Sequence, residues 1–150
     1  MQSVIKITGY WDMKLYGEDG TLKQSIRGKN VITTAGKEAL ANYLASAAAS
    51  ATLNPFKYVA IGTGGTAETA ADTAMSVEVA RAQGTASFTT GAAVYSVYAT
   101  FAAGTGTGAI VEYGLFNTLT GGTLFSRDTE AVINKGASDT LTVITQVTLS

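Results

Sequence analysis

The 150-residue sequence contains no histidine and no cysteine. Without histidine, the side chain most often used for acid–base catalysis near neutral pH is absent, and a Ser–His–Asp triad cannot be assembled. Without cysteine, thiolate nucleophiles, disulfides and Cys/His zinc sites are excluded. Only carboxylates, lysines, tyrosines and hydroxyl groups are left for chemistry. We therefore expect a protein that is not an enzyme and that uses no cofactor and no metal.

Charge is also scarce: acidic and basic residues make up 14% of the chain, and the formal net charge is −1. Domains that bind nucleic acid through its phosphates carry a clustered basic surplus, and the ten Lys/Arg here are scattered among eleven Asp/Glu. The first residues have no apolar signal-like run, and the uncharged residues 39–56 are too polar to span a membrane. We expect no nucleic-acid partner, no membrane partner and no secretory signal.

Alternation of apolar and polar residues begins near the N-terminus. Trp11, Met13 and Leu15 are separated by single, more polar residues, which is the period of a β-strand. The Asp19–Gly20 pair that follows is typical of a hairpin turn. The pattern predicts a β-hairpin over residues 9–27.

Large apolar groups occupy both faces of this predicted hairpin. A ribbon of that kind needs cover on both sides, because two strands alone are marginally stable in water. We therefore divide the chain into a hairpin of residues 1–27, acting as an attachment arm, and a body of residues 28–150. The alternative is that the hairpin simply joins the sheet of the body. The arm's candidate interface residues are Tyr10, Trp11, Met13, Leu15 and Tyr16.

One helix and a series of strands are predicted for the body. Thr33 or Thr34 can cap a helix near residues 34–46, in which Leu40, Tyr43 and Leu44 form an apolar stripe. Downstream, short apolar or alternating runs are separated by glycine-rich turns. This order predicts a mainly β fold, a β-sandwich or small barrel of about seven to nine strands with an N-terminal hairpin and one short α-helix.

The glycine-rich run at residues 62–67 (GTGGTA) follows an apolar strand and matches the form of a dinucleotide-binding fingerprint. Such a site also needs a helix directly after the glycines and an alternating strand–helix series. Residues 68–80 have few large apolar groups, and no such series follows. We interpret the run as a glycine turn.

Asp128 and Glu130 lie two residues apart and would share one face of a strand. Two carboxylates are the usual catalytic equipment of a glycosidase, and exposed tyrosines can stack on sugars. A carbohydrate-binding module or glycosidase is therefore an alternative function. We favour ordinary solvated carboxylates, and Asp12 and Glu112 look isolated.

No acidic or basic side chain occurs in residues 82–111. Exposed strand edges normally carry charges that block pairing with other chains. Their absence predicts that part of this stretch is covered in a homo-oligomer, with a trimer as the expected state; the alternative is a Thr/Ser face that water solvates. The candidate interface residues here are Tyr95, Tyr98, Thr100 and Thr107.

Four segments, in this order, resemble small virion structural proteins of tailed bacteriophages: residues 30–36 (NVITTAG), 59–64 (VAIGTG), 72–81 (DTAM and EVAR) and 112–127 (EYGLFN and GGTLFSR). The resemblance implies a virion protein assembled in the host cytoplasm, and it brings no catalytic residues. The leading hypothesis is a capsid decoration (cement) protein that binds the major capsid protein on the outside of the head lattice. A tail, neck or fibre component is the alternative.

Overall fold

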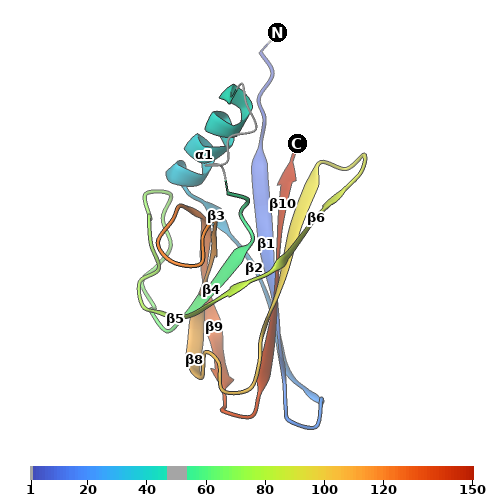
Figure 1. The fold of residues 1–150 in the computed structure, drawn as a ribbon, viewed down its shortest axis with the longest axis vertical. Coiled ribbons are helices and arrows are strands. Elements are labelled where there is room, and N and C mark those ends of the chain that lie inside the picture. The colour runs from blue at the N-terminus through green and yellow to red at the C-terminus, as the bar shows by residue number, and fades with distance from the viewer. Residues whose placement is uncertain (1, 47–53) are drawn as a thin grey trace.

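The computed structural model describes residues 2–46 and 54–150, which form ten β-strands and one α-helix. Two five-stranded antiparallel sheets pack into a β-sandwich (Figure 1). Across sheet A the order is β2 (Leu22–Lys29), β1 (Ile7–Tyr16), β10 (Thr140–Leu149), β7 (Val94–Phe101) and β6 (Thr85–Thr89). Across sheet B it is β3 (Val31–Ile32), β9 (Leu124–Lys135), β8 (Gly108–Phe116), β4 (Tyr58–Gly62) and β5 (Glu78–Gln83). The predicted mainly β fold with one short helix is confirmed, as a sandwich.

The main core lies between the two sheets and follows from the period-2 patterns of the strands. On β10, Leu141, Val143, Thr145 and Val147 are buried, and the residues between them are half-buried on the outer face. On β7, Val97 and Phe101 are buried in the same way. Since successive side chains of a strand point to opposite faces, this alternation gives each strand one apolar inner face.

The N-terminal hairpin belongs to this core. Strand β1 lies between β2 and β10 and pairs with β10 along its whole length, from Ile7 opposite Leu149 to Tyr16 opposite Thr140. Trp11 is 0% exposed, and its ring centroid lies 6.1 Å from that of Tyr113 on β8.

The interface prediction is therefore wrong for three residues of the hairpin. Trp11, Met13 and Leu15 are buried against the protein's own core, so they leave no surface for a partner. Tyr10 and Tyr16 are half-buried on the opposite face of β1. Within the described residues the hairpin supplies two strands of sheet A, one of them internal, rather than a detached arm.

Helix α1 (Thr34–Ala45) begins where the sequence predicts. The Oγ1 of Thr33 caps it by accepting a hydrogen bond from the Gly36 N–H at 2.9 Å. Tyr43 packs against the core, but Leu44 is 81% exposed, so the predicted apolar stripe is wrong at that residue. The helix ends at Ala45, close to the predicted residue 46, and residues 47–53 lie outside the described residues. In the described part of the chain, no helix has the length and apolar character needed to cross a membrane.

The outer face of sheet B is covered by the loop of residues 63–77, which joins β4 to β5 and is called the covering loop below. Phe116 and Leu124 are buried on this face, and Met75 of the covering loop packs against them. The outer face of sheet B is thus covered around Phe116 and Leu124, whereas Val132 on the same sheet is 42% exposed. Sheet A has a buried inner face and an accessible outer one.

Gly84 connects the two sheets by joining β5, the edge of sheet B, to β6, the edge of sheet A (Figure 1). A Cβ at Gly84 would stand 2.7 Å from the Tyr98 carbonyl oxygen, so only glycine lets the chain pass this closely. All five residues of β6 are exposed.

Candidate functional site

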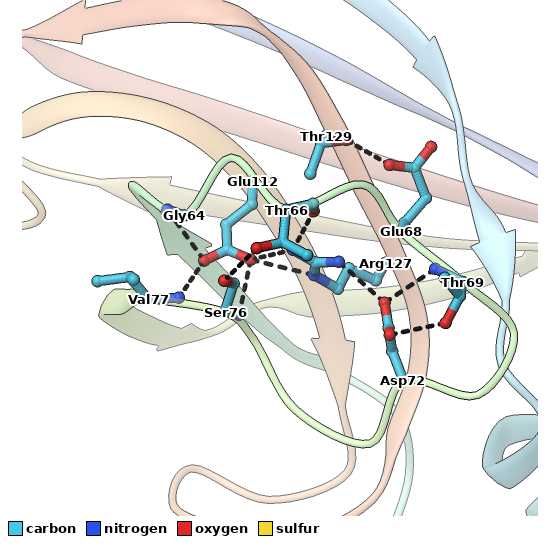
Figure 2. A network of polar contacts seen from close by, with 10 residues as sticks. All are labelled: Gly64, Thr66, Glu68, Thr69, Asp72, Ser76, Val77, Glu112, Arg127 and Thr129. Carbon is cyan, nitrogen blue, oxygen red and sulfur yellow. Dashed lines mark hydrogen bonds and ion pairs between the residues drawn. The ribbon is translucent and has the colours of Figure 1, made fainter.

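A buried ion network attaches the covering loop to sheet B (Figure 2). Arg127 of β9 donates to Glu112 Oε2 through Nε at 3.0 Å and Nη2 at 2.8 Å. Through Nη1 it donates to Asp72 Oδ2 of the covering loop at 2.9 Å. Arg127 is 2% exposed and Glu112 0%. One guanidinium therefore bridges two carboxylates in a water-excluded position.

Glu112 also holds the backbone of the loop at both ends. Its carboxylate accepts hydrogen bonds from the N–H groups of Gly64 at 3.2 Å, Ser76 at 2.9 Å and Val77 at 2.6 Å. For Asp72, desolvation by itself would raise the pKa, but hydrogen bonds from Thr69 and Arg127 lower it. With its hydrogen bonds satisfied, the network serves to position the loop.

This network corrects two sequence expectations. Glu112, expected to be isolated, is its most connected member. The glycine run at residues 62–67 is a loop segment, as interpreted, and its glycines allow the approach to Glu112. A Cβ at Gly64 would stand 2.5 Å from the Ser76 Cβ and 2.7 Å from Glu112 Oε1.

A second polar site lies where β2 of sheet A meets β9 of sheet B. It is a cavity of about 710 Å³, called the carboxyl pocket below. Its lining residues are Tyr10, Arg27, Gly28, Lys29, Glu68, Asp128 and Glu130. Asp128 and Glu130 of β9 do share one site, as their spacing predicts. Asp128 is only 1% exposed, so the expectation of solvated carboxylates is wrong for this residue.

Gly28 allows the two carboxyl groups to meet. A Cβ on Gly28 would stand 1.8 Å from Glu130 Oε1 and 2.6 Å from Asp128 Oδ2, so both oxygens converge on one point above this glycine. Asp128 Oδ2 finds no hydrogen-bond donor in the described part of the chain. Two ionised carboxylates cannot donate to each other, so a hydrogen bond within the pair requires a proton.

Burial is the main cause that raises the pKa of Asp128 to about 8, and the charges of Glu130 and Glu68 raise it further. Near neutral pH the Asp128 carboxyl is therefore mostly protonated. The buried Tyr113 hydroxyl, opposite Asp128 in the strand register, has its pKa raised mainly by desolvation and further by Asp128 and Glu130. The site thus gathers the carboxyl groups of Asp128, Glu130 and Glu68 beside a buried strand segment.

An apolar cavity of about 300 Å³ lies beneath α1, between the ends of the two sheets. Its lining includes Leu40 of α1, Tyr95 of β7 and Val147 of β10. The Tyr95 hydroxyl donates to the Phe56 carbonyl oxygen, and burial raises the pKa of Tyr95 to about 12. Tyr95, a predicted interface residue, is therefore half-buried and packs against the protein's own core.

The remaining interface candidates separate into two places. Tyr98 is 46% exposed on the outer face of sheet A, where Thr100 Oγ1 donates to its hydroxyl at 3.2 Å. Tyr10 and Tyr16 flank the same outer face from β1. Thr107 lies apart, exposed in the turn between β7 and β8.

Sequence reasoning missed Phe88, whose side chain on β6 is 78% exposed. The signal for it was present, because Phe88 is a large apolar residue between small polar ones in the uncharged stretch. Among the residues that the structure describes, no group of three or more acidic, His or Cys side chains is arranged to hold a metal ion.

Comparisons of the chain with protein-family models, with curated proteins and with solved structures gave no match.

Proposed function

We propose that this chain is a non-enzymatic structural protein of a tailed-phage virion, assembled through contacts between its own copies and with other virion proteins. The observation that carries the proposal is the free edge of sheet A at β6. This strand is exposed along its whole length and has no charged residue. Free backbone N–H and C=O groups at such an edge are a template for pairing with another chain.

The other sheet edges are protected. Strand β2, at the opposite edge of sheet A, carries Lys23, Arg27 and Lys29. In sheet B, edge strand β5 carries Glu78 and Arg81, and β3 is only two residues long. Charges and short strands are the usual means of preventing edge-to-edge association. The protein therefore protects three edges and leaves β6 open, beside exposed Phe88 and Tyr98.

Within the virion, a capsid decoration protein on the outside of the head is the leading assignment. The supporting observations are a small single sandwich with an accessible sheet A face and an edge suited to lateral contact. A tail, neck or fibre component would use the same surfaces at a ring. Both assignments rest on the resemblance to phage virion proteins.

Copy number in purified particles tests the proposal. We expect quantitative mass spectrometry to find hundreds of copies per particle, because a head lattice repeats its binding site that often. A few copies to dozens would move the assignment to the tail, neck or fibre. Absence of the chain from particles would contradict a virion role.

The shared site of Asp128 and Glu130 supports a second candidate, a carbohydrate-binding module or glycosidase. Their oxygens converge on one point, whereas glycosidases hold their carboxyl groups about 5–9 Å apart. We therefore expect no hydrolysis of host polysaccharide and no glycan binding that depends on this pair. Loss of a hydrolytic activity in the Asp128→Asn, Glu130→Gln double variant, with the fold intact, would establish the enzyme instead.

A further inference from the structure

The carboxyl pocket has more acidic than basic groups, and one of its two basic groups, Arg27, makes a contact with Tyr10. Its lining contains the acidic residues Glu68, Asp128 and Glu130 and the basic residues Arg27 and Lys29. The Arg27 guanidinium carbon lies 3.8 Å from the centroid of the Tyr10 ring, in a cation–π contact. The ion pairs of the described residues involve other carboxylates, at Glu78, Asp72, Glu112 and Asp139, and none includes Asp128 or Glu130.

The burial of Asp128 and its unpaired carboxyl oxygen indicate that the pocket binds a ligand. Asp128 is only 1% exposed. Its Oδ2 lies in the pocket beside Gly28 and has no hydrogen-bond donor among the described residues. Once Asp128 is ionised, its buried oxygen without a donor is costly, and a donor that also carries positive charge removes the cost most fully. The neighbouring Glu130 oxygen converges on the same point, so one group could serve both.

The protein already contains the matching arrangement one residue away. Arg127 bridges Glu112 and Asp72 with its Nε, Nη1 and Nη2 groups. A guanidinium suits two adjacent carboxylates because its donors form a planar fork, whereas an ammonium is a point charge. The carboxyl pocket likewise has two adjacent carboxyl groups, but no guanidinium pairs with them in the described residues.

We propose that the carboxyl pocket binds the guanidinium group of an arginine from a different protein, which bridges Asp128 and Glu130. This inference rests on the proposed function, because a virion partner would supply the arginine. A second copy of the chain does not supply it readily, since all three of its arginines are engaged: Arg27 on Tyr10, Arg81 with Glu78, and Arg127 with Glu112.

The probe for this site is N-acetyl-arginine N-methylamide, titrated into the ¹⁵N-labelled full-length chain and followed by NMR. We expect saturable shifts at the Gly28 and Glu130 amides. The citrulline analogue, which has the same shape without the charge, should bind at least tenfold more weakly. The lysine analogue should also bind more weakly, because an ammonium cannot form the fork. Equal binding of citrulline or of lysine would overturn the assignment to a guanidinium.

Variants and pH make the test specific to the pair. Asp128→Asn should weaken arginine binding at least tenfold, while Glu38→Gln on exposed α1 should not change it. Binding should tighten from pH 6 to pH 9, because the guanidinium pairs with ionised Asp128; the other groups facing it are Glu68, Glu130, Arg27, Lys29, Tyr10 and Tyr113.

Unchanged binding by the Asp128→Asn protein, with a native spectrum elsewhere, would overturn the site. A second variant, Gly28→Ala, places a methyl group at the point where the two carboxyl oxygens converge and should also weaken binding. If these tests fail, the proposed virion function is not affected, because it is tested separately by copy number in particles. If the chain is absent from particles but binds arginine, the proposed function is refuted and the arginine site in the carboxyl pocket still stands.

Discussion

Glu112 and Arg127 illustrate how single buried charges determine the shape of this protein. Truncating Glu112 leaves Asp72 as the one carboxylate on the buried Arg127 and removes the acceptor of the Gly64, Ser76 and Val77 N–H groups, which costs more than the pair contributes. Glu112→Ala should therefore destabilise the protein by about 3–5 kcal/mol. Chemical denaturation measures this, with exposed Glu38→Ala as the control, expected within about 0.5 kcal/mol of the parent protein. A Glu112 variant as stable as the control would show that the network does not hold the covering loop.

Asp128 should make the stability of the protein depend on pH. Its pKa is about 8 in the folded state, against about 4 for an unfolded carboxyl, so the folded state holds a proton that the unfolded state has lost between these values. The free energy of unfolding should therefore fall as pH rises from 4 to 8, by about 1 kcal/mol per pH unit, and level off above.

The matched comparison is Asp128→Asn, which keeps the shape and removes the titration. The difference in free energy of unfolding, variant minus parent protein, should increase as pH rises from 5 to 8. Urea denaturation at each pH measures this difference. Parallel pH profiles for the two proteins would show that Asp128 is ionised throughout this range.

Trp11 is a core residue, and its replacement should affect folding rather than attachment. Trp11→Ala should cost about 3–5 kcal/mol of stability, because a large ring is removed from between the two sheets. Thermal denaturation gives the value. A variant that retains parental stability but loses partner binding would restore the attachment role expected from the sequence.

Among single residues, the inner faces of β10 and β7 follow from local alternation of apolar residues, except at Thr145, a polar residue that is buried. Alternation could not predict that Trp11 is buried in the protein's own core or that Glu112 pairs with Arg127. Trp11 is buried because β1 pairs with β10, which lies at the other end of the chain. Glu112 lies within an apolar strand, and a charge in that position is the sequence signal that a partner such as Arg127 should be sought.

At the scale of elements, α1 is positioned by a backbone contact with β9. A Cβ on Gly36 would stand 2.5 Å from the Phe125 carbonyl oxygen and 2.8 Å from its Cα, and backbone atoms cannot move aside cheaply. Gly36→Ala should therefore destabilise the protein by about 1–3 kcal/mol. Gly65→Ala is the matched control, because its Cβ meets nothing within 4 Å. Equal denaturation midpoints for the two variants would contradict this docking geometry.

The elements themselves were largely predictable: the hairpin turn, the helix start at Thr33 and the strands with regular alternation. Their pairing was not, because sheet order depends on contacts between distant segments, such as β3 with β9. The step from β5 to β6 through Gly84 also escaped prediction. A single glycine does not reveal that a strand changes sheets there.

At the scale of the whole molecule, the two sheets differ in what they leave exposed. Sheet B packs on the inner core with one face, and the covering loop covers its other face around Phe116 and Leu124. Sheet A keeps an accessible face and the uncharged edge β6. This asymmetry gives the protein one direction for lateral association, as expected for a component of a repeating assembly.

Sedimentation velocity on the parent protein and two lysine variants tests the central claim most directly. Ser87→Lys places a charge on the open edge β6, and Ser25→Lys places the same charge on β2, which is already basic; both serines are exposed. We expect the parent protein and Ser25→Lys to form the same oligomer, and Ser87→Lys to associate at least tenfold more weakly, because the charge would be desolvated at the interface. A monomeric parent protein at all concentrations, or equal association of all three, would contradict assembly through β6.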